Sequence, residues 1–240
     1  MAEPASLIDL LALQPPGWGG NLLRGAVSTL EISSCAYGIG LLLGLGGAMG
    51  KLTGGKYLRA GLDGYTTLVR SLPELLLIVM LYYLGTSTLN QFLGSLGYSA
   101  IHINGFMAAV LVLGFVQGAY STEVLRGAIQ SIPIGQIEAA KAYGMGPLLR
   151  FRRIILPAML PYAIPGLSNL WLNATKDSAL VAVVGYSELA LETRQAAGGT
   201  KHYFIFFFAA AVLYLIISLI SLRVFGFIER RLRRGQPKLA

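Results

Sequence analysis

Five long apolar stretches dominate this chain of 240 residues. They cover, with approximate ends, residues 22–49, 65–84, 105–124, 155–171 and 204–225. A helix needs about 20 apolar residues to cross the hydrocarbon core of a bilayer. Only 12% of the residues are charged, well below the roughly 25% of a soluble domain. The pattern predicts an all-α membrane protein with five transmembrane helices, because a helix satisfies its own backbone hydrogen bonds in lipid.

Most of the 19 lysine and arginine residues lie in three segments, 51–59, 126–153 and 223–238, which follow the first, third and fifth apolar stretches. Loops rich in these residues stay in the cytoplasm. The pattern therefore predicts a periplasmic N-terminus and a cytoplasmic C-terminus. The net charge of +8 is also compatible with nucleic-acid binding. Basic residues gathered at span ends indicate membrane topology instead, so no nucleic-acid partner is expected.

Several kinds of site find no support in the sequence. Cys35 is the only cysteine, so one chain cannot form a disulfide, and His102 and His202 lie too far apart in sequence to suggest a metal site. Residues 50–56 have the glycine and lysine spacing of a phosphate-binding loop, but Tyr57 stands where such a loop needs Ser or Thr. We expect no metal, no cofactor, no catalytic residues and no enzymatic activity, so a partner must supply any energy.

We divide the chain into three parts. Residues 1–20 form an N-terminal segment whose apolar run is too short to span and is expected at the membrane interface. Residues 21–232 form one transmembrane domain, and residues 233–240 form a basic cytoplasmic tail. Residues 179–185 are too short to cross, and we expect a re-entrant or gating segment. The first span also carries glycine pairs at a spacing that lets helices approach closely: Gly40 with Gly44, and Gly46 with Gly50.

Residues 132–157 form the longest basic, helix-capable segment between apolar stretches. Pro133 suits the first turn of a helix, where its missing N–H costs little. Gly144 supplies the backbone freedom to end that helix and turn. Pro147 then starts a second short helix over residues 148–153. The sequence predicts a helix-turn-helix elbow at a membrane surface.

This elbow resembles the EAA loop of bacterial ABC importer permeases, and its spacing is unbroken. The resemblance implies the MetI-like fold of type I importer permeases, in which the loop fits a groove on a cytoplasmic ATPase. It assigns ATPase coupling to the residues that carry the motif: Glu138, Ala139, Ala140, Gly144, Leu156 and Pro157.

The same resemblance implies the partners and the location. The partners are an ABC ATPase dimer, a second permease subunit that is identical or a sister chain, a periplasmic substrate-binding protein, an amino-acid substrate and membrane lipid. The location is the bacterial inner membrane. The implied mechanism is alternating access, driven by ATP hydrolysis on the separate ATPase subunits.

Two charged residues interrupt the second apolar stretch. Arg70 and Glu74 lie four residues apart, so one continuous helix would place them on the same face. Charges inside a span are costly and are usually paired or functional. Two compatible interpretations stay open. The residues form a structural ion pair, or Glu74 faces a central cavity and attracts the cationic side chain of a substrate.

Residues 120–123, followed by Arg126, are similar to a recurrent stretch of amino-acid permeases. Glu123 and Arg126 lie three residues apart at the end of the third span. We favour a helix-end pair that orients the elbow over direct substrate contact.

Residues 176–180 resemble the Lys-Asp-Ser/Thr-x-Leu stretch of polar amino-acid permeases. The resemblance implies that Asp177 binds a substrate ammonium group and that Ser178 and Asn173 add hydrogen bonds. The alternative is that Asp177 caps the helix that follows. Further along, Glu188 and Glu192 are expected on an outer, solvated helix face.

The substrate class rests on residues 64–70 followed by Pro73 and Glu74. They resemble the histidine/lysine/arginine/ornithine and arginine permeases, which implies a polar, basic amino acid. Opine permeases of the same family are an alternative. Two other functional classes stay open, an ATPase-independent channel or carrier and a structural membrane subunit.

Overall fold

The computed structural model describes residues 7–96 and 104–233. Throughout these residues the regular structure is helical. The helices are α1 (Leu7–Leu10), α2 (Gly19–Thr53), α3 (Lys56–Ser71), α4 (Glu74–Ser95), α5 (Gly105–Gln130), α6 (Ile134–Ala142), α7 (Pro147–Arg150), α8 (Leu156–Asp177), α9 (Leu189–Thr200) and α10 (Tyr203–Leu232). His102 and the predicted tail beyond Arg233 lie outside the described residues.

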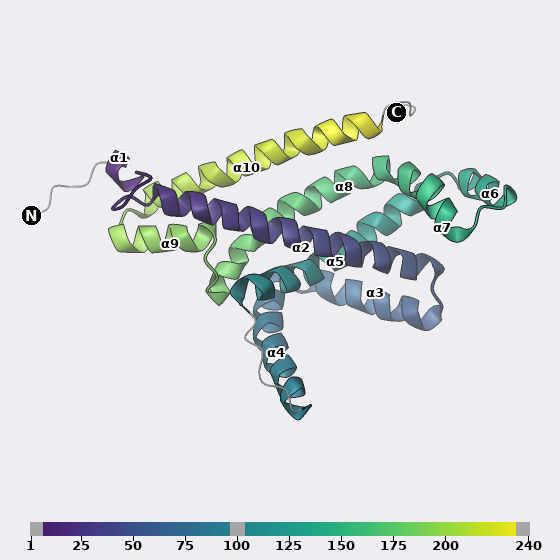
Figure 1. Ribbon diagram of the computed structural model, residues 1–240, viewed down its shortest axis with the longest axis horizontal. Helices are drawn as coiled ribbons and strands as arrows, with labels where there is room; N and C mark the ends of the chain where they lie inside the picture. Colours follow the sequence, from purple (N-terminus) through teal and green to yellow (C-terminus); the bar gives the residue numbers. More distant parts are fainter. Residues whose placement is uncertain (1–6, 97–103, 234–240) are drawn as a thin grey trace, which may run out of the picture.

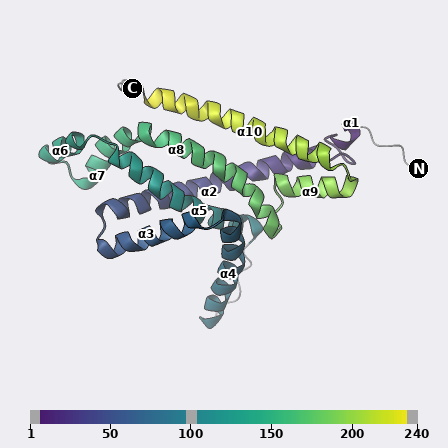
Figure 2. The same ribbon diagram turned by 180° about the vertical axis from the view of Figure 1, so that it is seen from behind.

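Within the described residues, five helical segments are long and apolar enough to cross a membrane, which confirms the predicted fold class. They are α2, α4, α5, the unbroken run Pro147–Val184 that contains α8, and α10. Figures 1 and 2 show α2, α5, α8 and α10 roughly along the long axis of the molecule. Helices α1 and α9 lie at one end, and α6 and α7 lie at the other.

The predicted second span, residues 65–84, is wrong. Helix α3 already begins at Lys56, and it ends at Ser71. Leu72 is extended, with ψ of 145°, because the ring of Pro73 disfavours helical backbone at the residue before it. A new helix, α4, starts at Glu74 and leaves the bundle in a different direction (Figure 1). Residues 51–59, expected in a basic loop, therefore belong mostly to helices α2 and α3.

Close contact between α2 and α5 forms the centre of the bundle. A Cβ added to Gly44 would lie 2.4 Å from the Cβ of Ser121, and one added to Gly40 would lie 2.7 Å from the Cβ of Gln117. The first predicted glycine pair therefore does allow close approach. The second pair differs, because Gly46 has open space around it and Gly50 meets only side chains of α3.

Residues 178–184 continue α8 as a 3-10 helix that ends at Gly185, whose φ is +85°. The chain then reaches Glu188, the N-cap of α9. Its carboxylate is fully buried and accepts hydrogen bonds from Thr29 Oγ1 at 3.1 Å, Tyr214 OH at 3.0 Å and Leu191 N–H at 3.0 Å. Burial raises the pKa of Glu188, and these donors oppose that rise.

The predicted solvated position of Glu188 is thus wrong. Capping turns the carboxylate back over the first turn of α9, toward α2 and α10. Glu192 is half-buried and accepts a hydrogen bond from Ser187. Glu188 therefore joins three helices at the end of the molecule that lies away from α6.

A buried lysine joins α2, α3 and α5 toward the other end of the molecule, where α6 lies. The side chain of Lys51 is only 5% exposed, and its ammonium group lies 2.7 Å from Asp63 Oδ1 and 2.6 Å from Glu123 Oε1. It also donates to Thr66 Oγ1 at 2.6 Å. Arg126 holds the other oxygen of Glu123 through Nη2 at 2.7 Å. A buried charge survives only when it is paired and hydrogen-bonded, and Lys51 is both.

Replacing Lys51 with methionine should destabilise the fold by about 3 kcal/mol, because it leaves the half-buried Glu123 with one cationic partner. Chemical unfolding in a neutral detergent measures the change. Lys56→Met is the matched control, since Lys56 is exposed and forms no ion pair in residues 7–96 and 104–233. The double variant Lys51→Met/Glu123→Gln should lose less stability than the two single changes together. Equal stability of the Lys51→Met and Lys56→Met chains would refute a role for the buried pair.

Candidate functional site

The elbow between α5 and α8 is built around Gly144. Helix α6 ends there in a Schellman motif, in which the Met145 N–H bonds to the Ala140 carbonyl at 3.0 Å and the Gly144 N–H bonds to that of Lys141 at 2.9 Å. Gly144 has φ of +70°, a left-handed conformation that costs a residue with Cβ roughly 1–2 kcal/mol. The turn therefore requires the backbone freedom of glycine. The small size of glycine is not the reason, since a Cβ at this position would have no described atom within 4 Å.

The second arm of the elbow is joined to a membrane span without a break. Pro147 occupies the first turn of α7, and residues 151–155 continue as a π-helical turn into α8. A displacement of this arm would therefore be transmitted to the span that follows. The predicted second helix, residues 148–153, is observed as α7 plus the start of this turn.

The motif residues lie on different surfaces of the elbow. Glu138, Ala139, Gly144 and Pro157 are exposed, Ala140 is buried and Leu156 is half-buried. Apolar side chains beside them are also exposed: Ile134 by 65%, Tyr143 by 85% and Leu148 by 79%. An exposed apolar patch rimmed by polar residues is typical of a protein interaction site.

The basic segments of the sequence meet at the elbow end of the molecule. The junction of α2 and α3, the elbow and the end of α10 all lie there, as both ribbon views show (Figures 1 and 2). These are the segments that contain Lys56, Arg152 and Arg230. Their common location agrees with a single aqueous side for all three loops.

A polar cluster lies deeper in the bundle, where α4, α5 and α8 meet. Tyr120 OH donates to Glu74 Oε1 at 3.2 Å, and Gln117 Nε2 donates to Asp177 Oδ2 at 3.3 Å. Glu74 and Asp177 thus bring their carboxyl groups to the same cluster through neighbouring residues of α5. The amide oxygen of Gln117 is buried and finds no hydrogen-bond partner among residues 7–96 and 104–233. The cluster thus brings two carboxyl groups and a side-chain amide together as hydrogen-bond acceptors.

Other residues expected at a substrate site lie around this cluster in different ways. Arg70 places its guanidinium carbon 6.0 Å from the centre of the Tyr120 ring. The expected shared helix face of Arg70 and Glu74 is wrong, because the break at Pro73 puts them in separate helices. Within the described part of the chain, Arg70 forms no ion pair with Glu74.

Asn173 lies one turn before Asp177 on α8 and is half-buried. Ser178 is fully buried, and its hydroxyl donates to the Thr175 carbonyl at 2.8 Å. Asp177 makes no side-chain capping bond to the 3-10 helix that follows it, so the capping alternative is wrong.

Sequence reasoning missed Gln117 and Lys51. Gln117 is uncharged, so it does not stand out as a candidate within an apolar span. Lys51 was missed because it was assigned to a basic loop. The available signal was the uninterrupted helical composition through Thr53, which places Lys51 inside α2.

Comparison with known proteins agrees with this geometry. Residues 38–234 match the family described as binding-protein-dependent transport system inner membrane component. The octopine transport system permease protein OccQ of Agrobacterium tumefaciens (strain Ach5) is 40% identical over 228 residues, which cover 95% of this chain and 96% of that one. The histidine/lysine/arginine/ornithine transport system permease protein HisQ of Escherichia coli (strain K12) is 37% identical over 219 residues, or 91% of this chain and 96% of that one.

A solved structure shares the fold. The crystal structure of an amino acid ABC transporter with histidines contains a chain that is 28% identical and superposes with a TM-score of 0.74. The match covers 89% of this chain and 95% of the other. From the family match and these relatives we conclude that this chain belongs to the inner membrane components of binding-protein-dependent transport systems, the permease subunits of ABC importers.

Proposed function

We propose that this chain is the membrane-spanning subunit of an ATP-driven importer for amino acids or opines with a cationic group. The observation that carries the proposal is the elbow, an exposed apolar surface held in a fixed turn by Gly144 and continuous with a membrane span. A partner bound to this surface could move the elbow, and the movement would reach α8 directly. The names of OccQ and HisQ support the substrate class.

The partner at the elbow is an ABC ATPase subunit, and Glu138, Ala139, Ala140, Gly144, Leu156 and Pro157 are its coupling residues. ATP is hydrolysed there, and the permease has no nucleotide site of its own. A second permease subunit, identical or a sister chain, completes the pathway with a second ATPase. Coupling requires that the elbow binds the ATPase with different free energies in its two nucleotide states.

We place the elbow in the cytoplasm and the N-terminus in the periplasm. Support comes from the basic loops gathered at the elbow end, since such loops stay on the cytoplasmic side. A periplasmic binding protein then delivers substrate at the end that holds α1 and α9. The C-terminal end of α10 lies on the cytoplasmic side.

The substrate site is the cluster formed by Glu74, Asp177, Gln117 and Tyr120. A guanidinium or ammonium group brings only donors, and the cluster supplies two carboxylates and an unpaired amide oxygen. Charge-assisted hydrogen bonds to such a group are about twice as strong as neutral ones. Asn173 lies one turn from Asp177 on α8 and remains a candidate for substrate binding. Ser178 is a weaker candidate, because its hydroxyl already donates to the backbone carbonyl of Thr175.

Two other classes of function compete with this proposal. An ATPase-independent channel or carrier would show substrate flux without a partner, and a structural subunit would show none in any assembly. A channel or carrier that works alone gives no reason for the exposed apolar side chains of the elbow. Co-purification of the chain with an ATPase subunit separates the proposal from both.

Changing Gly144 to aspartate should abolish ATP-dependent uptake while leaving membrane insertion intact. The substitution strains the left-handed turn and adds a negative charge to the docking surface. Gly146→Asp is the matched control, because Gly146 has φ of −61° and precedes α7, where aspartate is a favoured N-cap. Uptake of labelled arginine into vesicles that contain the whole importer measures the effect. Normal uptake by the Gly144→Asp importer would contradict the coupling role.

Neutralising the cluster with Glu74→Gln or Asp177→Asn should weaken selection for cationic substrates. Loss of one charge-assisted bond, about 1.5–3 kcal/mol, corresponds to roughly a tenfold or greater rise in the KM of uptake. Competition among histidine, arginine, lysine, ornithine, octopine and nopaline measures the preference. Glu229→Gln, at the far end of α10, is the control for a lost carboxylate. A preference for cationic competitors that survives both substitutions would exclude this cluster as the site.

A further inference from the structure

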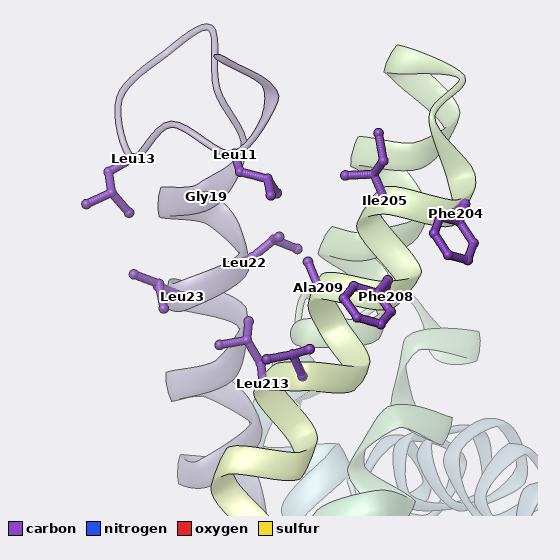
Figure 3. Close-up of a pocket in the computed structure, with 11 residues that line it drawn as sticks. Leu11, Leu13, Gly19, Leu22, Leu23, Phe204, Ile205, Phe208, Ala209 and Leu213 are labelled. Atoms are coloured by element: carbon purple, nitrogen blue, oxygen red, sulfur yellow. The ribbon is translucent and has the colours of Figure 1, made fainter. Parts of the chain in front are cut away.

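An apolar groove lies between the first turns of α2 and α10 (Figure 3). These turns are at the end of the molecule away from the elbow (Figure 1). Its volume is about 570 Å³. Leu22 and Leu23 line it from α2, Phe208 and Leu213 line it from α10, and Leu11 lines it from the segment before α2 (Figure 3). All 11 lining residues are glycine, alanine or larger hydrocarbon side chains.

Several of these side chains remain open to the surroundings. Phe204 is 81% exposed, Phe208 is 61% exposed and Leu23 is 47% exposed. Phe204 and Phe208 stack on each other, with ring centroids 5.9 Å apart. Both flanking helices are long and apolar enough to span a membrane, so we expect the groove to open toward the hydrocarbon of the bilayer.

The outer end of the groove leads to polar residues. A second cavity, of about 310 Å³, is lined by Lys201, His202 and Tyr203, and it shares Phe204 and Ile205 with the groove. Lys201 ends α9 with φ of +64°, and its backbone N–H bonds to the Ala197 carbonyl at 2.8 Å. Its ammonium group is exposed and has no carboxylate partner within 4.0 Å among residues 7–96 and 104–233.

We propose that the groove binds one acyl chain of an anionic phospholipid whose phosphate lies at Lys201. The order of the two cavities, hydrocarbon inside and an unpaired cation at the mouth, matches the order of an acyl chain and its headgroup. Tyr203 lies at the junction, where amphipathic aromatic residues favour the membrane–water boundary.

The lipid would fill the space between the first membrane span and the last. Leu11 belongs to the N-terminal segment, so the lipid would also fix that segment over the mouth of the groove. This role is independent of which substrate the importer carries. It requires only that α2 and α10 lie in a membrane.

The test uses the full chain in a neutral detergent, mixed with phosphatidylglycerol or phosphatidylcholine that carry the same acyl chains. Native mass spectrometry counts the lipid retained per protein. Ala209→Trp fills the groove, and Ala211→Trp adds the same bulk to an exposed position of α10 that does not line it. Lys201→Asn removes the charge with a residue that tolerates the left-handed backbone. Arg24→Asn is its control, at an exposed position outside both cavities.

The unaltered chain should retain phosphatidylglycerol about fivefold better than phosphatidylcholine, the effect of one basic residue near an anionic headgroup. Ala209→Trp should lose retention of both lipids, and Lys201→Asn should lose only the preference. Both control variants should behave like the unaltered chain. Equal retention of the two lipids by the unaltered chain, or a preference kept by Lys201→Asn, would overturn the proposal.

A second copy of the chain is the competing occupant, and a cross-link distinguishes it. A cysteine in place of Phe208, in a chain with Cys35→Ser, should remain unlinked when the protein is oxidised in lipid vesicles. A disulfide between two copies at this position would overturn lipid occupancy, because it places protein where the acyl chain should lie.

Discussion

The pairing of Lys51 with Glu123 is the interaction on which the rest of the structure depends. A cation that is 5% exposed in a membrane protein is tolerated only with close partners, and Lys51 of α2 finds them on two other helices, α3 and α5. The pair therefore fixes the ends of α2, α3 and α5 relative to one another. Since α5 leads directly into the elbow, the pair also fixes where the elbow emerges from the bundle.

The proposed substrate cluster and the elbow are connected through the same helices. Tyr120, which bonds to Glu74, lies one turn before Glu123 on α5. Arg70, which lies over the Tyr120 ring, is one turn beyond Thr66 on α3. Movement of the elbow would thus reach the cluster through two packed helices held together by one buried cation. We regard this arrangement as the physical link between ATP-driven motion and access to the cluster.

Local patterns in the sequence predict the spans and the elbow well. Apolar length identifies the membrane helices, and Gly144 adopts the left-handed turn because few other residues do so without strain. The sequence does not predict the burial of Lys51 or Glu188 or the partners of their charged groups. These partners lie far away along the chain, up to 72 residues from Lys51 and up to 159 residues from Glu188. The predicted bounds of the second span were wrong, because Pro73 disfavours helical backbone at Leu72 and so ends the helix within a continuous apolar pattern.

The central claim is that the elbow faces the cytoplasm and is covered by an ATPase. The most direct measurement places a single cysteine at Ala139, in a chain with Cys35→Ser, and labels it with a membrane-impermeant maleimide. We predict labelling from the cytoplasmic face alone, and protection when the ATPase subunit is bound. Labelling from the periplasmic face, or labelling that the bound ATPase leaves unchanged, would contradict the account.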